Sequence, residues 1–462
     1  MTTWLGRPAT EIAEAVRAGE VTALAVVEEH LGHIRRTEPR VGAFEVVDEE
    51  GARTAARLVD ERVDRSSLPL AGVPVGIKDN ADVAGLPSRH GSAGSSDRPA
   101  TADSELVARL RRAGAVVVGK TRMPELALAT VGDNAFGVAR NPWNLSRVSG
   151  GSSSGSAAAL SSGQVPLALG SDGGGSIRLP SAACGTLGLK PGSGTLPPRA
   201  EDPRAAWCGL SQYGPMATTV ADLALMLEVL AGSGARRLPA TNGLKVAASS
   251  SPTTFSRFVV DGPLLAAWQR ATGTLERLGA HVRDATPPYP AFLARALATR
   301  GFIGAQYDVE HAEIDRRHIG PRTRTVLRLA RVAGQLAPPR DDEANEWKRA
   351  ADEFFAVHDV LVTPAAGMTA FPHRDWHAKG FVRLTPAMAR FAAFTGPWNL
   401  ADLPAAAVPM GLAPDGLPIA VQVVAGRGRE DLVLAVAALL EREHPWPRHA
   451  PGWLSELADS RR

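Results

Sequence analysis

The sequence predicts a layered α/β protein, because short apolar segments alternate with segments that have helical periodicity. Residues 73–77 and 115–118 are short, apolar and rich in valine, as buried strands are. Between them, apolar residues repeat at helical spacing after Asp103, which we expect to cap a helix, and Gly114 is expected to end it. This order of strand, helix and strand predicts a sheet covered by helices.

Helices are also expected at both ends of the chain. Thr10 and Thr22 are typical N-caps, and a pair of amphipathic helices is expected after them. A residue pattern typical of strands and turns returns over residues 395–424, and a last amphipathic helix is expected over about 429–443. The arginine-rich region between about 235 and 390 has few glycine motifs and is expected to be helical.

Composition indicates a globular, enzyme-sized protein that binds neither nucleic acid nor membrane. Hydrophobic residues make up 44% and charged residues 21%, and the net charge of +3 comes without a basic cluster. Only Cys184 and Cys208 occur, which argues against a disulfide framework and for a reducing compartment. No apolar run reaches the roughly 18 residues of a membrane helix, and the first residues lack a signal-peptide pattern. We therefore expect a cytoplasmic protein.

Three motifs suggest other chemistry, and each has a simpler explanation. Residues 114–121 match a phosphate-binding loop, but three consecutive valines favour a strand. Residues 151–155 match the nucleophile elbow of α/β-hydrolases, but no apolar strand directly precedes them. His373 and His377 have metal-binding spacing, but Pro372 precedes them and no third ligand is near, so an exposed loop is expected. We expect no metal, nucleotide or other cofactor.

Two glycine- and serine-rich stretches carry the chemistry. Residues 150–156 run directly into alanines of high helix propensity, so this stretch is expected to enter a helix rather than to form a linker. Further along, Gly173, Gly174 and Gly175 stand directly before Ser176. Consecutive glycines let backbone N–H groups approach a ligand closely, which is what holding an oxyanion requires.

Several blocks in this order resemble the amidase signature family of serine amidohydrolases. The resemblance spans nearly the whole chain, is weakest at 235–390, and implies a large mixed twisted β-sheet flanked on both faces by α-helices. It also implies one domain over 1–462, with a signature core at about 68–235, a variable helical section at about 236–390 and a return to the core at about 391–445. The blocks that carry it are residues 72–80, 119–125, 150–156, 172–178, 184–191, 395–404 and 415–418.

The resemblance implies a triad of two serines and a lysine. Ser176 stands at the position of the nucleophile, Ser152 at that of a bridging serine that follows a cis peptide bond, and Lys78 at that of the general base. A hydroxyl needs an adjacent base near neutral pH, and a lysine is a base only when burial keeps it uncharged. Lys78 follows an apolar strand, in a chain with six lysines against 45 arginines.

The remaining site residues also come from the resemblance. The N–H groups of Gly173, Gly174 and Gly175, with that of Ser176, stand at the oxyanion hole, and the family positions of Ser153 and Asp172 imply supporting roles. Gly173 replaces a bulkier residue, which predicts a wider acyl pocket. Aromatic residues of the variable section are candidates to line that pocket, although such residues are more often core: Phe302, Tyr307, Trp347 and Phe394.

The resemblance implies an amidase that cleaves a linear, non-peptide carboxamide C–N bond of a small molecule through an acyl-enzyme. Three alternatives stay open: the glutamine-hydrolysing component of a tRNA amidotransferase, an acyl-enzyme transferase that forms amides, and an inactive binding protein. The chain has only three tyrosines and lacks the tyrosine-rich segment associated with that amidotransferase component. A homodimer is left open.

Overall fold

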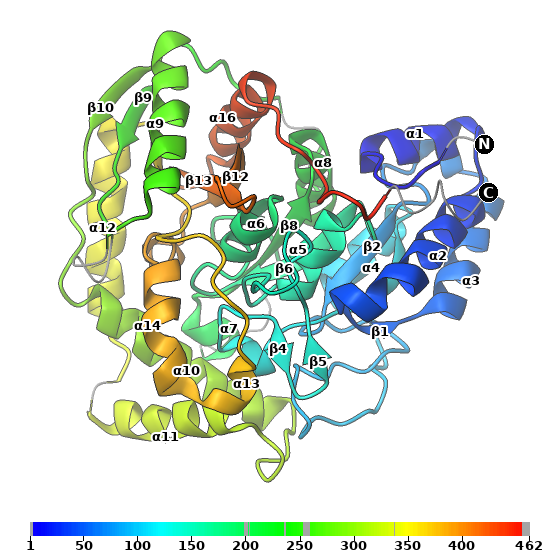
Figure 1. The fold of residues 1–462 in the computed structure, drawn as a ribbon, viewed down its shortest axis with the longest axis horizontal. Coiled ribbons are helices and arrows are strands. Elements are labelled where there is room, and N and C mark those ends of the chain that lie inside the picture. The colour runs from blue at the N-terminus through cyan, green and yellow to red at the C-terminus, as the bar shows by residue number, and fades with distance from the viewer. Residues whose placement is uncertain are drawn as a thin grey trace.

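An eleven-stranded mixed sheet runs through the described part of the chain, and helices cover it (Figure 1). The computed structural model describes residues 3–197, 202, 204–234, 237–252, 259–336 and 338–454. In sheet order the strands are β1 (Phe44–Val47), β3 (Val116–Thr121), β2 (Pro74–Lys78), β6 (Leu167–Asp172), β8 (Gln212–Ala217), β7 (Leu187–Lys190), β12 (Ala405–Leu412), β13 (Pro418–Ala425), β11 (Val360–Pro364), β9 (Lys245–Ala248) and β10 (His281–Asp284). The predicted large mixed sheet is thereby confirmed.

Parallel and antiparallel strands are segregated within this sheet. Strand β2 pairs in parallel with β3 and β6, and β9 pairs in parallel with β10 and β11. The strands between these two groups pair antiparallel, from β6 through β8, β7, β12 and β13 to β11. A separate hairpin joins β4 (Asp133–Asn134) to β5 (Gly137–Val138). The parallel group around β2 brings several strand ends to one edge, where the candidate site lies.

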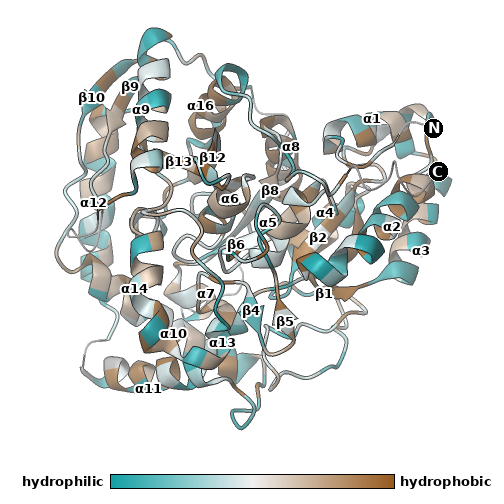
Figure 2. Ribbon diagram, in the orientation of Figure 1, coloured by the Kyte–Doolittle hydropathy of each residue, from teal (hydrophilic) through white to brown (hydrophobic). Residues whose placement is uncertain are grey.

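The helices range from single turns to nineteen residues. The larger ones carry hydrophilic residues on their outer sides, as α2 and α3 do in Figure 2. In chain order they are α1 (Ala9–Ala18), α2 (Ala23–Val41), α3 (Glu49–Glu61), α4 (Glu105–Arg112), α5 (Ser154–Ser161), α6 (Arg178–Cys184), α7 (Ala205–Cys208), α8 (Val220–Ala231), α9 (Gly262–Arg277), α10 (Leu293–His311), α11 (Pro321–Leu336), α12 (Asp341–Val357), α13 (Trp376–Lys379), α14 (Phe381–Phe391), α15 (Pro397–Leu400) and α16 (Glu430–Glu443).

The predicted helix starts are partly right. Thr22 caps α2, since its side chain accepts a hydrogen bond from the N–H of Ala25. Thr10 is not a cap: it lies inside α1, where its hydroxyl and N–H donate to the distant carboxylate of Asp222. Asp103 is not the cap of α4 either, because its carboxylate accepts the N–H of Ala84 instead. In both cases a tertiary partner replaces the local one that the sequence suggests.

The section expected to be helical, 236–390, also contributes three strands. Strands β9, β10 and β11 come from this section and complete one end of the main sheet. Each has only four or five residues, which is too short for a periodic pattern to stand out among long helices. Residues 236, 253–258 and 337 of this section lie outside the described residues.

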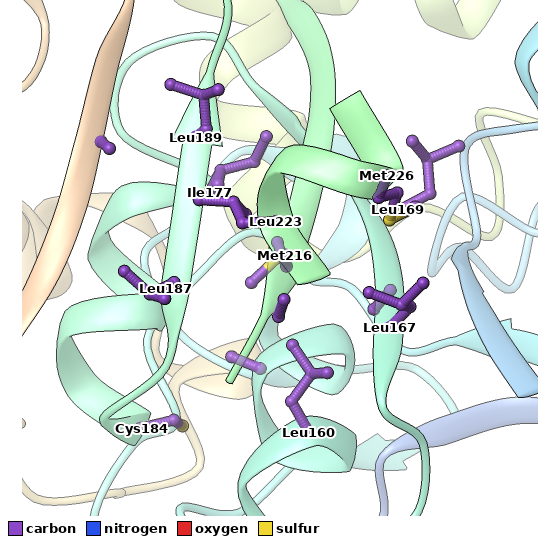
Figure 3. Close-up of a cluster of buried hydrophobic side chains, with 14 of the residues drawn as sticks. Leu160, Leu167, Leu169, Ile177, Cys184, Leu187, Leu189, Met216, Leu223 and Met226 are labelled. Atoms are coloured by element: carbon purple, nitrogen blue, oxygen red, sulfur yellow. The ribbon is translucent and has the colours of Figure 1, made fainter. Parts of the chain in front are cut away.

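The two helices that enter from the glycine- and serine-rich stretches are buried. All residues of α5 and α6 are buried, and the two helices pack against each other and against the central strands. Figure 3 shows Leu160 of α5 and Leu167 of β6 in one apolar cluster, with side chains from β7, β8 and α8. A helix that is buried on every side holds its N-terminus in a fixed place. None of the helices in the described ranges combines the length and apolar character needed to cross a membrane.

Gly155 and Gly273 test the packing of α5, because both are helical glycines in different surroundings. A Cβ on Gly155 would lie 2.1 Å from the carbonyl oxygen of Ala43, whereas one on Gly273 of α9 meets no atom within 4 Å. We expect Gly155→Ala to lower the free energy of unfolding by about 1–3 kcal/mol through overpacking. Gly273→Ala should raise it by about 0.5–1 kcal/mol. Urea denaturation measures both, and equal effects would contradict the close packing of α5.

Candidate active site

Two parallel strands bring Lys78 and Ser171 to the same edge of the sheet. Ile77 of β2 lies opposite Leu169 of β6, so the residues that end both strands are neighbours. The carboxyl ends of parallel strands commonly form the binding edge of an α/β sheet. Lys78 and Ser171 therefore face each other because of strand register, although 93 positions separate them.

The Lys78 amine is fully buried among hydroxyl and carbonyl oxygens. Its Nζ lies 2.8 Å from Ser152 Oγ, 2.8 Å from Ser171 Oγ and 3.1 Å from the Ser171 carbonyl oxygen. The side chain of Asn80 donates a further hydrogen bond of 3.0 Å to Ser171 Oγ. Ser171 is not among the site residues that the sequence suggests. The available signal was its position directly before Asp172, just after the apolar residues 165–169.

Ser152 enters the site from the loop before α5, and the Gly151–Ser152 peptide bond is cis, as the resemblance implies. The next residue, Ser153, connects this loop to the rest of the site. Its N–H donates to the carbonyl of Ser176 over 3.0 Å, and its hydroxyl lies 3.2 Å from the carbonyl of Ser171. These bonds hold the 150–156 loop against both β6 and the loop that carries Ser176.

The turn between β6 and α6 presents Ser176 half-buried at the wall of a cavity that Ser152 also lines. Gly175 fits this turn only as glycine. Its φ is +126°, and a Cβ there would lie 2.4 Å from Thr395 Oγ1. The hydroxyl of Thr395 in turn donates to the carbonyl of Gly174 over 2.6 Å. The C-terminal part of the chain thus fixes the turn.

One of the three glycine amides is already hydrogen-bonded within the protein, which revises the expected oxyanion hole. The N–H of Gly175 donates to the carboxylate of Asp172 over 2.6 Å and is therefore engaged. The N–H groups of Gly173, Gly174 and Ser176 have no hydrogen-bond acceptor among the described residues. Of the four amides from Gly173 to Ser176, these three therefore remain open to a ligand within the described part of the chain.

Asp172 organises the turn through a buried ion pair with Arg178. Arg178 donates to both carboxylate oxygens over 2.9 Å, and Asn399 and the N–H of Ile177 donate to the same carboxylate. Burial by itself raises the pKa of Asp172, but the charge and hydrogen bonds of Arg178 outweigh it and hold that pKa well below its usual range. Asp172 is therefore ionised and supports the turn.

The other nearby carboxylate, Asp79, lies 3.5 Å from Lys120 in a second buried ion pair. Asp79 also accepts the N–H groups of Arg89 and Gly91. Burial raises the pKa of Asp79 to about 6, although the charge of Lys120 acts in the opposite direction. Asp79 and Asp172 are thus each paired with a cation other than Lys78.

Two cavities of different character meet at Ser176. The larger has a volume of about 380 Å³, and its walls come mainly from α10, α14 and the 127–130 segment. No charged side chain is among the described residues that line it. The smaller has a volume of about 10 Å³. Polar side chains, including Ser152, Ser171, Asn80 and Asp308, line one part of it, and Met123, Leu126, Ala127 and Trp207 line another.

The four aromatic residues predicted to line the acyl pocket lie in different places. Phe302 lines the larger cavity, whereas Trp347 and Phe394 are fully buried in the core and Tyr307 lies at a separate surface hollow. The sequence did not single out Trp207, which borders both cavities.

Gly173 does not widen the pocket, which contradicts the expectation from its small size. A Cβ on Gly173 would lie 2.9 Å from the indole ring of Trp207, so that ring already occupies the space.

The motifs that suggested other chemistry lie in ordinary secondary-structure elements. The phosphate-loop match at 114–121 lies largely in β3, as its valines predict. His377 lies in α13 rather than in an exposed loop, where its N–H donates to the carboxylate of Asp133. Within the ranges that the structure describes, no group of three or more His, Cys, Asp or Glu side chains could hold a metal ion.

Comparisons with known proteins identify relatives that match almost the whole chain. A family model described as Amidase matches residues 25–434. AmiB2 of Mycobacterium tuberculosis, which is named as an amidase, is 38% identical over 450 residues, covering 94% of this chain and 95% of that protein. An acylamidase of Rhodococcus erythropolis is 33% identical over 473 residues, covering 97% of each chain. The solved structure of 6-aminohexanoate cyclic dimer hydrolase has a TM-score of 0.88 at 30% identity, covering 97% and 99%.

Asp172→Asn tests the buried ion pair, because it leaves the charge of Arg178 uncompensated. We expect a loss of about 3–5 kcal/mol in the free energy of unfolding at neutral pH. The folded pKa of Asp172 is lowered, so its contribution is present at neutral pH and is lost as the pH falls below about 4. The difference between wild type and variant should therefore shrink in acid. The exposed pair of Arg62 with Asp64 supplies the control, since Asp64→Asn should change stability little.

Proposed function

The chain belongs to the amidase family, and we propose that it cleaves a carboxamide C–N bond through an acyl-enzyme on Ser176. The proposal rests above all on the 2.8 Å contact between the buried Lys78 amine and Ser152 Oγ, in a cavity wall that Ser176 shares. Being an amidase follows from the family. The roles of individual residues are our proposal.

Lys78 acts as the base in its uncharged form. Burial disfavours a charged amine, and an uncharged amine offers two N–H donors and one lone pair. The contacts are compatible with this inventory, with the two N–H groups directed at the oxygens of Ser171 and the lone pair accepting the hydroxyl proton of Ser152. Ser171 positions the amine so that its lone pair faces Ser152.

Acylation uses a proton relay through Ser152. Lys78 accepts the proton of Ser152, and Ser152 accepts that of Ser176 as the Ser176 oxygen attacks the amide carbonyl. Negative charge develops on the carbonyl oxygen, where the free N–H groups of Gly173 and Gly174 and that of Ser176 stabilise it. Each such donor is typically worth about 3 kcal/mol in the transition state.

The relay then runs in reverse to complete the cycle. Ser152 donates its proton to the departing amine nitrogen and regains one from Lys78, which leaves an acyl ester on Ser176. Water attacks this ester as its proton passes through Ser152 to Lys78. The C–O bond to Ser176 then breaks, the relay returns the proton to the Ser176 oxygen, and the carboxylic acid leaves. An amine in place of water would instead form a new amide.

The larger cavity bears on the glutamine-hydrolysing alternative. Free glutamine carries an ammonium and a carboxylate, and burying unpaired charges against apolar walls is costly. The uncharged lining of the described cavity therefore favours other amides as substrates. Comparing ammonia release from glutamine and from an uncharged amide separates the two functions. Product analysis with added hydroxylamine separates hydrolysis from acyl transfer.

Ser176→Ala should lower kcat/KM for amide hydrolysis by more than about 1,000-fold, because the attacking oxygen is lost. A fluorophosphonate probe should label the wild type at Ser176 and leave the variant unlabelled. The exposed Ser146 provides the matched control, and Ser146→Ala should retain both activity and labelling. Near-normal turnover by purified Ser176→Ala would refute the acyl-enzyme on this residue.

Lys78→Met should lower kcat/KM by about 100- to 10,000-fold, because general-base assistance is lost while side-chain volume is kept. Lys245 begins β9 with an exposed side chain, so Lys245→Met controls for the loss of one positive charge. Wild-type activity should fall as acid protonates the base, and the Lys78→Met variant should lose that acid-side limb. Equal activity of the two variants would exclude Lys78 as the base.

A further inference from the structure

Two cavities of unequal size open from Ser176. The residues that line them indicate which cavity takes the acyl group of the substrate and which takes the leaving nitrogen. They share Ala127, Gly173, Ser176 and Trp207 and otherwise differ in character. The polar cavity has a volume of about 10 Å³, which is room for about one water-sized molecule. The apolar cavity, at about 380 Å³, is within the range of sites that take small organic ligands.

The proton relay decides which half of the substrate enters which cavity. The departing nitrogen must collect a proton from Ser152, so it must lie within hydrogen-bond reach of that hydroxyl. Ser152 lines the polar cavity and is not among the residues that line the apolar one. The nitrogen therefore leaves through the polar side, and the acyl group extends into the apolar cavity.

Trp207 limits the size of the polar side. Its ring packs against Gly173, and its backbone packs against Gly304, where a Cβ would lie 2.3 Å from the Trp207 Cα. Its indole N–H donates to Asp308 over 3.1 Å. The turn that carries it, Ala205–Cys208, has three consecutive residues with positive φ, a conformation that non-glycine residues rarely adopt and that surrounding contacts must hold.

We propose that the preferred substrates are primary carboxamides with an uncharged, apolar acyl group, and that Trp207 enforces the small leaving group. The proposal rests on the proposed acyl-enzyme mechanism. In the reaction the C–N bond breaks, the nitrogen takes the proton of Ser152 and departs as ammonia, and water later supplies the hydroxyl of the acid. Ammonia is close to water in size and fits the polar cavity, whereas an aniline does not.

The apolar wall selects the acyl group by desolvation. Leu297, Phe302 and Met388 line this cavity with aliphatic and aromatic surface, and the described lining residues offer no charge to pair with a carboxylate or an ammonium. An apolar chain or ring is stabilised there, whereas a charged end is not. The acyl half is therefore chosen by α10 and α14 rather than by the serine-rich loops.

The experiment compares 4-phenylbutanamide with its N-methyl and N-phenyl derivatives, which share one acyl group. Wild type should prefer the primary amide over the N-methyl amide by about tenfold or more, because an added methyl in a closed site costs about that factor. The N-phenyl amide should be poorer still. Succinamate, which ends in a carboxylate, should be at least about tenfold poorer than butanamide.

Substitution of Trp207 tests its role directly. Trp207→Ala should raise the ratio of kcat/KM for the N-methyl over the primary amide by about tenfold, and Trp207→Phe should keep most of the wild-type preference. Phe302→Ala is the matched control, since Phe302 lines only the apolar cavity. It should change the preference for acyl size and leave the leaving-group ratio within about twofold of wild type.

The outcomes separate this inference from the mechanism. If wild type hydrolyses the N-phenyl amide as fast as the primary amide, and Ser176→Ala abolishes both reactions, the inference is wrong and the mechanism stands. If Ser176→Ala retains turnover, the mechanism itself is wrong. If Trp207→Ala does not fold, the wild-type series and Trp207→Phe still decide.

Discussion

The site depends on one buried amine that is held by oxygen atoms of serine side chains and backbone. Lys78 lies within 3.1 Å of Ser152 and Ser171, in a place where a charged group is costly and a polar one must be hydrogen-bonded. Strand register between β2 and β6 sets this geometry, and the loop before α5 completes it. The catalytic proposal and the substrate proposal both follow from where this amine directs Ser152.

A second buried network fixes the other side of the site. The Asp172–Arg178 pair anchors the turn that bears Ser176, and Arg178 also donates to the carbonyl of Thr395 and the side chain of Gln422. The turn after β6 is thereby joined to β13 and to the segment before α15. This explains how residues 395–422, far along the chain, shape a site built from residues 78–178. The network also engages the N–H of Gly175, so the proposed oxyanion hole has fewer donors than three consecutive glycines suggest.

In our substrate proposal, the two halves of substrate recognition come from different parts of the chain. Polar residues near the strand ends and the serine-rich loops line much of the small cavity, whereas α10, α14 and the 127–130 segment form most of the large one. Trp207 stands between them, and Gly173 and Gly304 leave it the necessary space. Changes in α10, α14 or Trp207 can therefore alter the substrate without touching Lys78, Ser152 or Ser176.

The sequence by itself predicted the alternation of strands and helices outside the variable section, the family, and Lys78, Ser152 and Ser176 as the candidate triad, because apolar periodicity and ordered motifs are local properties. Tertiary structure decided which of these groups meet and what surrounds them. It places the Ser171 hydroxyl in hydrogen-bond contact with Lys78 and directs the N–H of Gly175 to Asp172. It also packs the Trp207 ring into the space beside Gly173. The strands of the variable section are likewise identified only by their pairing with neighbouring strands. Many such contacts join residues tens to hundreds of positions apart, and packing rather than local propensity selects them.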